Sequence, residues 1–442
     1  MFIIKAVISS VGISNFCHLD GRWLGLNSDQ SGANVDQIVK MFGNFIVNQL
    51  SKPVKWALFS AIALVLAACS GGNLGGMFDG GGSQGGFNNS APQQVTQAKI
   101  ALLLPLSASG KMASVASSMK RAAEMALLEA GKSSIILITK DTGGNAQTAA
   151  AQAQAAIDEG AEIILGPLFG SEVAAVAPIA KARNIPVIAF SSVSAVARPG
   201  VYLMSFLPEE EVSNVLRHSS KKGITSLVAL LPRSQYGAVI EKALKASTAR
   251  LGIKIIGIEH FNRNGQNLSS AAARIARAVN SQTNPAQAVF IPEGGQNLRA
   301  IGAALSQAGF SNKSAKVLGT GLWDSPVTNG TPLAFGGWYA GVSPQQVNAF
   351  NQRYAASYQT NPPRVASLAY DALSLAIAFA KSPVGTRFTP QQITNPQGYN
   401  GVNGLFRFRP DGRIERGLAI LEITSSGTQV TANPPAKFQF GF

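Results

Sequence analysis

Cysteine is almost absent from this chain of 442 residues, which contains only Cys17 and Cys69. Because no cysteine follows Cys69, the part of the chain beyond it cannot contain an internal disulfide bond. An oxidising compartment is compatible with this composition, but no cross-link supports the fold. Stability must come from a hydrophobic core, and 46 % of the residues are hydrophobic.

Histidine is also scarce, and the motifs of common enzymes are missing from the part expected to fold. His218 and His260 have no second histidine or cysteine at the spacing of a zinc site. No nucleophile elbow, dinucleotide fingerprint or Walker A loop occurs there. Two Ser-x-x-Lys matches, Ser117/Lys120 and Ser219/Lys222, lack the companion motifs of penicillin-recognising enzymes. We therefore expect no enzyme activity, no metal and no cofactor.

Acidic residues are few, since 22 of them face 37 lysines and arginines, which gives a net charge of +15. The basic residues are scattered, and no aromatic-interleaved basic stripe or nucleic-acid module is present. Nucleic acid is therefore not expected as a partner. A sequence-independent attraction to anionic lipid headgroups or cell-wall polymers fits the charge better. The acids Glu209, Glu210 and Glu211 follow Pro208 and are typical of a helix start rather than of acid catalysis.

Long hydrophobic runs are limited near the amino terminus to Trp56–Ala68, whose 13 residues fall short of the roughly 20 that span a bilayer. Lys52 and Lys55 precede this run, and small residues end it, in the order of a secretory signal. The ending Leu-Ala-Ala-Cys resembles the lipobox of bacterial lipoproteins, which implies acylation of Cys69. The alternative is an ordinary buried thiol.

The remaining amino-terminal sequence divides into three segments. Residues 1–40 show no periodicity, and we interpret them as an extension before the true start or as a long leader. Residues 41–68 are the expected signal peptide. Residues 69–97 contain the candidate lipidated Cys69 and a glycine-rich stretch that is typical of a flexible linker.

Strand-like and helix-like segments alternate regularly from Lys99 onward. Lys99–Leu104 is a continuous apolar run ended by Pro105, which is typical of a buried parallel strand. The alternation restarts at Ser226, so the pattern predicts a second series of the same kind. We therefore expect an α/β protein with two doubly wound parallel-sheet lobes joined by a hinge. Two independent Rossmann-like domains are the alternative interpretation.

The expected boundaries follow from these two series and from the later segments. Residues 98–207 and 336–395 are predicted to form the first lobe, residues 208–335 and 396–430 the second, and residues 431–442 a tail. Leu405–Phe408 and Ile414–Ile423 flank Pro410-Asp411-Gly412, which predicts a hairpin.

Ligands of open α/β sheets bind beyond the carboxyl ends of the strands. Four loops expected there contain small polar residues, and we expect Ser171 to cap its helix and to leave N–H groups for a carboxylate. Each serine could instead be no more than a helix cap. The loops are 105–111 (PLSASGK), with Ser107, 166–171 (GPLFGS), 191–195 (SSVSA) and 292–296 (PEGGQ).

Three segments give the chain a family resemblance over roughly residues 99–424. They are LLLPLSASG, GPLFGSEVAAVAPIAKARNIPVIAFSS and PRSQYGAVIEKALKA. They resemble the type I periplasmic-binding proteins of the leucine/isoleucine/valine and amide-binding class. This resemblance implies a small polar ligand, an amino acid or amide, held between two lobes and delivered to an ABC permease. It implicates Ser171, Ser192, Ser194, Tyr236 and Glu293 as ligand contacts, beside Ser107. The loop SSVSA departs from the family's usual Pro-Ala-Thr-like run.

A narrower resemblance involves LLLPLS, the GPL turn and the segment FLPEEEV. These are similar to lipoproteins that activate penicillin-binding proteins, which implies docking onto a peptidoglycan synthase instead of transport. Typical members have an additional amino-terminal helical-repeat domain, where this chain has a glycine tether. Both interpretations, the solute-binding protein and the activator, imply a periplasmic protein held by a lipid anchor. Ser70 after Cys69 is not the aspartate of inner-membrane retention, which favours the outer membrane.

Overall fold

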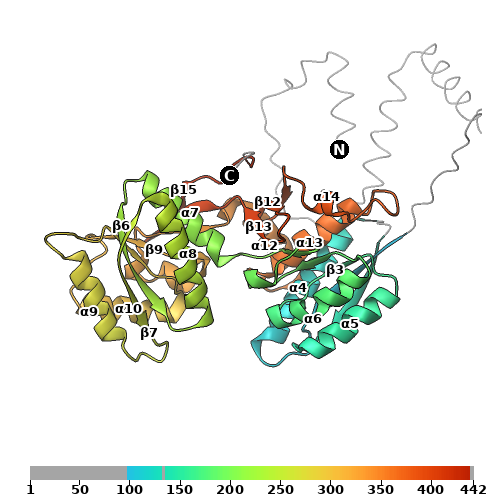
Figure 1. The fold of residues 1–442 in the computed structure, drawn as a ribbon, viewed down its shortest axis with the longest axis horizontal. Helices are drawn as coiled ribbons and strands as arrows, with labels where there is room; N and C mark the ends of the chain where they lie inside the picture. Colours follow the sequence, from blue (N-terminus) through green and yellow to red (C-terminus); the bar gives the residue numbers. More distant parts are fainter. Residues whose placement is uncertain (1–96, 132–134, 439–442) are drawn as a thin grey trace, which may run out of the picture. The chain divides into compact units, whose positions relative to one another are not determined.

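The protein is represented by a computed structural model, which describes residues 97–131 and 135–438. The predicted leader, signal peptide and lipidated Cys69 lie outside the described residues. So does the linker, apart from its last residue. The described residues belong to one compact unit (Figure 1).

The first sheet has five parallel strands in the order β2-β1-β3-β4-β5. These strands are β1 (Ala98–Leu104), β2 (Ile135–Asp141), β3 (Ile163–Leu165), β4 (Val187–Ala189) and β5 (Val201–Leu203). The predicted apolar run forms the interior strand β1, in which Ile100–Leu104 are 0 % exposed. Its continuous hydrophobicity reflects helices on both sheet faces, because a strand covered twice has no polar side. β5 is a three-residue strand that sequence analysis missed.

Five helices surround this sheet: α4 (Lys111–Glu129), α5 (Ala146–Asp158), α6 (Gly170–Ala182), α12 (Pro344–Tyr358) and α13 (Ala366–Phe379). The pairs α4–α13 and α5–α6 pack closely against each other. α12 joins through Phe350 and Tyr354, which pack on Ala122 and Met125 of α4. We call this sheet and its helices the first lobe.

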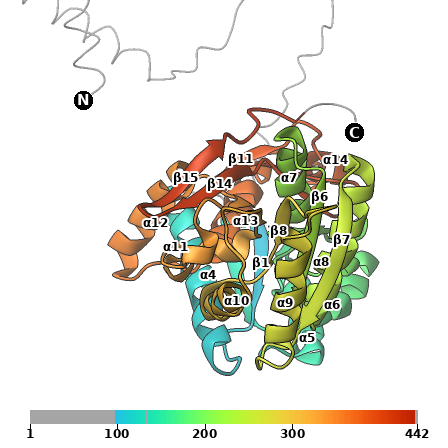
Figure 2. The same cartoon turned by 90° about the vertical axis from the view of Figure 1, so that its left-hand side faces the viewer.

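The second sheet has seven strands in the order β15-β14-β10-β9-β8-β6-β7. The strands are β6 (Ser226–Pro232), β7 (Lys254–Phe261), β8 (Ala288–Phe290), β9 (Lys316–Leu318), β10 (Trp338–Gly341), β14 (Ala419–Thr424) and β15 (Gly427–Ala432). β6 to β10 run parallel, whereas β14 and β15 are antiparallel additions at one edge. Figure 2 shows β6, β7 and β8 side by side.

Helices cover both faces of this second sheet. Along β6, Leu227, Ala229 and Leu231 contribute to one core, whereas Val228 and Leu230 contribute to the other. This alternation follows from the two-residue period of a strand. The covering helices are α7 (Pro208–Lys221) and α8 (Gln235–Leu251) on one face, and α9 (Leu268–Val279) and α10 (Gly295–Gln307) on the other. We call this assembly the second lobe, and the predicted α/β class with parallel sheets is confirmed.

The predicted hairpin forms in part. β12 (Gly404–Phe408) and β13 (Ile414–Arg416) pair antiparallel, with Phe408 opposite Ile414, and β11 (Tyr399–Gly401) extends them to a small third sheet. The expected strand Ile414–Ile423 is divided, because β13 ends at Arg416 and β14 belongs to the second sheet. The third sheet packs on the first lobe through its aromatic side chains.

The distribution of later segments between the lobes also differs from the prediction. Residues 336–395 were expected in the first lobe, but β10 is a fully buried strand between β9 and β14 of the second sheet. Residues 396–430 were expected in the second lobe, but β11–β13 pack with the first. β15 extends to Ala432, so it takes up the first residues of the expected tail. In the described residues the chain therefore crosses between the lobes near 204–207, 342–343 and 416–418.

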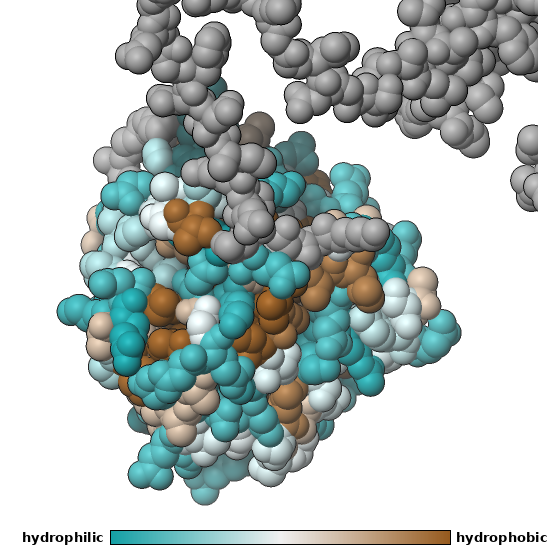
Figure 3. All heavy atoms as spheres, turned by 90° about the vertical axis from the view of Figure 1, so that its right-hand side faces the viewer, coloured by the Kyte–Doolittle hydropathy of each residue, from teal (hydrophilic) through white to brown (hydrophobic). Residues whose placement is uncertain are grey.

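Short helical turns complete the described structure. They are η2 (Ser194–Val196), η3 (Gly321–Trp323), α11 (Pro326–Asn329), η4 (Pro332–Ala334) and α14 (Pro390–Ile393). Figure 3 shows one face of the molecule, on which hydrophilic and hydrophobic residues are interspersed. Among the described residues, no helix combines the length and hydrophobicity needed to cross a membrane.

Candidate functional site

Each parallel sheet presents the carboxyl ends of its strands at one edge, and the loops there form a rim. We call the loops after β1 to β4 the first rim and those after β6 to β9 the second rim. The predicted site residues Ser107, Ser192 and Ser194 lie in loops of the first rim, with Ser171 in the helix that follows one of them. Tyr236 and Glu293 belong to the second. All six candidates therefore lie near the carboxyl ends of the strands, where open α/β sheets bind their ligands.

Ser107 is an exposed residue in the loop after β1. Its N–H donates to Oδ1 of Asp141 at 3.2 Å, and the N–H of Gly143 donates to the same oxygen at 2.9 Å. Burial raises the pKa of Asp141, but these hydrogen bonds outweigh it, so the pKa lies below its ordinary value. The rim therefore keeps Asp141 ionised, and sequence analysis did not identify this acid.

Ser171 is not the cap of its helix, contrary to the prediction. α6 begins at Gly170, and its N-cap position is Phe169, so Ser171 is the second helical residue and is exposed. The N–H of Phe169 instead donates to Oε2 of Glu172 at 3.1 Å. The acid three residues beyond the cap folds back on the helix start, as in one half of a capping box.

Glu172 is completely buried, with 0 % of its surface exposed. Burial raises its pKa, while the hydrogen bond from the Phe169 N–H acts in the opposite direction. Asp141 raises it further by charge repulsion. The start of α6, where a ligand carboxylate was expected, is therefore already beside a carboxyl group of the protein.

The loop after β4 places Ser192, Val193 and Ser194 in succession. Ser194 donates a hydrogen bond to Oε1 of Glu209, while Ser192 is exposed. A Cβ atom on Gly170 would lie only 3.1 Å from Cγ2 of Val193. An apolar side chain thus packs closely over the first residue of α6, and glycine is what permits this approach.

Tyr236 lies in the first turn of α8, which Ser234 caps by accepting the N–H of Gly237 at 3.1 Å. Its hydroxyl is 3.0 Å from Oγ1 of Thr320, which is fully buried after β9. Burial raises the pKa of Tyr236 well above its ordinary value, so the phenol stays protonated. Tyr236 therefore contributes a neutral hydroxyl to the second rim, and its role as a ligand contact stays a prediction.

Glu293 is 2 % exposed and has two polar partners. Nε of Arg263 lies 2.8 Å from its Oε1, and Nδ2 of Asn297 lies 3.0 Å from its Oε2. Both carboxylate oxygens are engaged, so Glu293 orients Arg263 instead of presenting a free acid. Arg263 follows β7 and was missed, because an isolated arginine in a loop gives no signal in the sequence.

A bridge between the lobes joins Glu211 of α7, Gly321 after β9 and Arg364, which precedes α13; we call it the interlobe bridge. Oε1 of Glu211 is 3.0 Å from Nη2 of Arg364, and its Oε2 accepts the Gly321 N–H at 2.9 Å. Nη1 of Arg364 donates to the Gly321 carbonyl at 3.2 Å. A Cβ on Gly321 would lie 2.3 Å from Oε1 of Glu211, so a larger residue there would displace the side chains of the bridge.

Two arginines enclose Phe206 where the chain first crosses between the lobes. The Cζ atoms of Arg364 and Arg416 lie 3.8 and 4.8 Å from the centre of its ring. Nε of Arg416 donates to the carbonyl of Ser205 at 2.8 Å. Burial lowers the pKa of Arg416 to about 10, which still leaves it charged at neutral pH. The first and third crossings are thus tied to each other.

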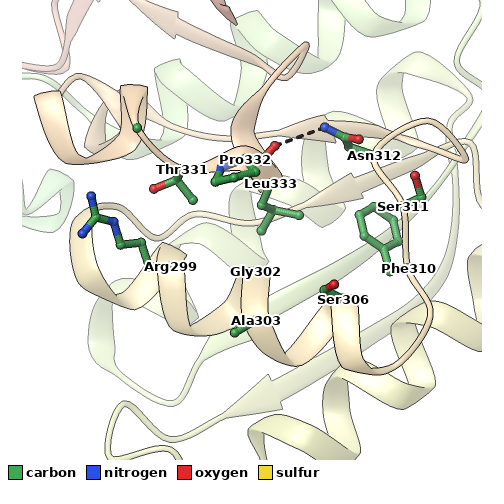
Figure 4. A pocket seen from close by; sticks show the side chains of 11 residues that line it. Arg299, Gly302, Ala303, Ser306, Phe310, Ser311, Asn312, Thr331, Pro332 and Leu333 are labelled. Carbon is green, nitrogen blue, oxygen red and sulfur yellow. Dashed lines mark hydrogen bonds between the residues drawn. The ribbon is translucent and has the colours of Figure 1, made fainter. Parts of the chain in front are cut away.

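A hollow in the second lobe lies away from the candidate ligand residues. It follows α10 and the segment after it, has a volume of about 440 Å³, and contains none of the six candidates (Figure 4). Its lining includes Arg299, Phe310 and Leu333, and Asn312 beside it donates to the carbonyl of Pro332. No group of three or more metal-ligating side chains occurs in the part of the chain that the structure describes.

Comparison with known proteins agrees with this geometry. Residues 97–428 match the family described as periplasmic binding proteins, and the chain belongs to that family. Membership implies an extracytoplasmic location and a protein that binds solutes. An uncharacterized protein from Rickettsia prowazekii is 22 % identical over 241 residues, which cover 54 % of this chain and 64 % of that protein. The match thus spans less than two thirds of this relative.

Solved structures share the fold at low identity. A putative branched-chain amino acid ABC transporter protein from Rhodospirillum rubrum has a TM-score of 0.65 at 19 % identity, covering 75 % of this chain and 99 % of that one. LivJ from Streptococcus pneumoniae, in complex with isoleucine, has a TM-score of 0.56 at 18 % identity, covering 78 % and 100 %. A Rhodopseudomonas palustris solute-binding protein, in complex with 3,4-dihydroxybenzoic acid, has a TM-score of 0.56 at 18 % identity, covering 77 % and 99 %. The predicted type I periplasmic-binding fold is confirmed.

Proposed function

We propose that the protein is a lipid-anchored, non-enzymatic solute-binding protein that captures a small polar ligand between its two rims for an ABC permease. The observation that carries this proposal is the neutral hydroxyl of Tyr236, held by buried Thr320 at the carboxyl edge of the second sheet. Hydroxyls of Ser107, Ser192 and Ser194 lie on the corresponding edge of the first. Polar groups of this kind on both rims suit a ligand that touches both lobes.

The charges of the first rim favour an amide or another uncharged donor over a free carboxylate. In the described residues, Asp141 and Glu172 bind backbone N–H groups and no cation within ion-pair distance. A ligand carboxylate at this rim would meet the negative charge of Asp141, whereas an amide NH₂ or an ammonium would be attracted. We therefore propose an amide or amino-acid-like ligand whose donor group faces the first rim.

A second function is favoured by one observation. Ser194 and the Gly321 N–H, both on the rims, already donate to Glu209 and Glu211 of α7. Fewer free donors remain for a solute, as expected of a regulator that activates a peptidoglycan synthase through protein contact. In both functions we propose that acylated Cys69 anchors the protein, with the outer membrane favoured.

A thermal-shift screen of the purified full chain tests the proposal against amino acids, amides and muropeptides. A ligand at about 100 times its dissociation constant should add about 2.7 kcal/mol to the free energy of unfolding. Tyr236→Phe should abolish that gain, while Tyr370→Phe, whose hydroxyl binds Glu129 away from both rims, should keep it. A screen without any shift, together with co-purification of a peptidoglycan synthase, would replace transport by the regulator.

A further inference from the structure

A second hollow lies on the first lobe, beside the loop that follows β1. It runs between α4 and the segment after α12 and has a volume of about 770 Å³. Its lining consists of Lys111, Ser114, Val115, Ser117, Ser118, Arg121, Tyr358, Thr360, Asn361, Pro362 and Pro363. We call it the α4 groove, and none of the six predicted ligand residues belongs to it.

The α4 groove has a cation at each end and no acid in its lining. Lys111 and Arg121 are ten residues apart on one helix, which corresponds to about 15 Å along its axis. Lys111 is the first residue of α4, and the first turn contains no acid. The helix end has a partial positive charge, so a lysine there is unfavourable for the helix and adds to a positive potential.

The other cation is held in place by an aromatic neighbour. Cζ of Arg121 lies 5.6 Å from the centre of the Tyr358 ring, and the Tyr358 hydroxyl donates to the Arg121 carbonyl at 2.8 Å. The nearby acid Glu124 is already paired with Lys120 at 2.5 Å. The positive charge of Arg121 is therefore not cancelled within the groove.

Neutral hydrogen-bonding groups occupy the space between the two cations. Hydroxyls of Ser114, Ser117 and Thr360 and the amide of Asn361 line it, next to the apolar Pro362 and Pro363. Ser118 donates to the carbonyl of Ser114 at 2.9 Å and can still accept. Alternating hydroxyls and small apolar surfaces match a sugar ring, which has both hydroxyl groups and C–H faces.

We propose that the α4 groove binds an acidic oligosaccharide, with carboxylates at Lys111 and Arg121 and sugar hydroxyls at the serines between them. This site is independent of the solute site between the rims. It adjoins the interlobe bridge, because Pro363 of the groove directly precedes Arg364 in the chain. The Ser117/Lys120 motif, which has no catalytic context, acquires a binding role at Ser117.

Fluorescence anisotropy with a labelled hexuronic-acid tetrasaccharide and the purified full chain tests this proposal. Lys111→Gln combined with Arg121→Gln should weaken binding by at least about tenfold, since both carboxylate contacts are lost. The matched control is Lys181→Gln combined with Arg183→Gln, two exposed cations at the carboxyl end of α6, which removes the same charge and should change affinity by less than about twofold. Ser117→Ala should weaken binding of the sugar in the otherwise native chain.

Three outcomes would overturn the proposal. These are absence of binding to the native chain, equal loss in both double variants, and tighter binding of an acidic peptide of the same charge. Equal loss would mean nonspecific attraction, and preference for the peptide would assign the groove to a protein partner. Thermal unfolding of each variant shows whether it is folded. Tyr236→Phe should leave tetrasaccharide binding unchanged, so a failure here is distinguishable from a failure of the solute site.

Discussion

The acidic residues of the two rims have different partners. On the first rim, Asp141 and Glu172 accept hydrogen bonds from backbone N–H groups of neighbouring loops. On the second rim, Glu293 is paired with Arg263, and the interlobe bridge pairs Glu211 with Arg364. The first rim therefore keeps the negative charge of Asp141, whereas the second is closer to neutral and offers the Tyr236 hydroxyl. Lobes of similar architecture thus present different chemistry to a ligand between them.

This difference shows that the fold sets where a ligand can bind, whereas single residues set which ligand is accepted. The strand ends place polar loops at both edges in any protein with this topology. Whether a helix start receives a ligand carboxylate depends on single residues, here Glu172 in the first turn of α6 and Val193, which packs against Gly170 from the loop after β4. The departure of the loop SSVSA from the family's usual sequence coincides with that covered helix start.

The largest effect is expected from removing the cation of the interlobe bridge. Arg364→Met leaves Glu211, which is 5 % exposed, without its charge partner, and should lower the free energy of unfolding by about 2–3 kcal/mol. Arg274→Met breaks the exposed pair with Glu259 and should cost less than about 1 kcal/mol. Urea unfolding measures both. Equal losses would show that the bridge is an ordinary surface ion pair.

A smaller effect is expected at the second rim. Tyr236→Phe removes the hydrogen bond to Thr320 and should lower stability by about 1 kcal/mol. Since the folded pKa of Tyr236 is raised, its contribution is complete below the unfolded pKa and is lost as the pH rises toward the folded value. The native chain should therefore lose more stability than the variant in strongly alkaline buffer. Parallel pH profiles would contradict the burial of this hydroxyl.

On the first rim the expected change has the opposite sign. The pKa of Glu172 is raised in the folded state, so ionisation opposes folding once the pH exceeds the unfolded value. The stability of the Glu172→Gln variant relative to the native chain should therefore increase between acidic and neutral pH, as measured by thermal unfolding. It should also improve binding of carboxylate ligands. A stability difference that stayed constant with pH would show that the pKa of Glu172 is the same in the folded and unfolded states, which would contradict the effect of its burial.

The smallest effect is expected at Ser171, which sequence analysis placed in the site. Ser171→Ala should change stability by less than about 0.5 kcal/mol, because the residue is exposed and does not cap α6. Asn145→Ala is the informative control, since its Oδ1 accepts the N–H groups of Gln147 and Thr148 at 2.8 and 3.1 Å. Asn145→Ala should lower the free energy of unfolding by about 1 kcal/mol. A comparable loss at Ser171 would restore it as a cap.

The sequence was sufficient for the fold class because its signals are local and periodic. The run Lys99–Leu104 and the restart at Ser226 each correspond to a buried parallel strand. The assignment of β10 and β13 to lobes could not be predicted, since a short apolar run does not show which sheet it joins. At the site, the family resemblance singled out Tyr236, and the structure shows its hydroxyl beside Thr320, while its contact with a ligand stays a prediction. Glu172 was not recognised as part of the rim. An acid in the first turn of a helix gives the same sequence pattern whether it only stabilises that helix or also faces a ligand site.

The most direct test of the account is whether ligand changes the distance between the lobes. Residues 70–442 contain no cysteine, so after Cys17→Ser and Cys69→Ser a dye pair can be introduced as Asp158→Cys on α5 and Arg277→Cys on α9. The account predicts that an amide ligand changes energy transfer between the dyes, and that Tyr236→Phe abolishes the change. Tight ligand binding with unaltered transfer, or a change that persists in the variant, would contradict capture between the rims.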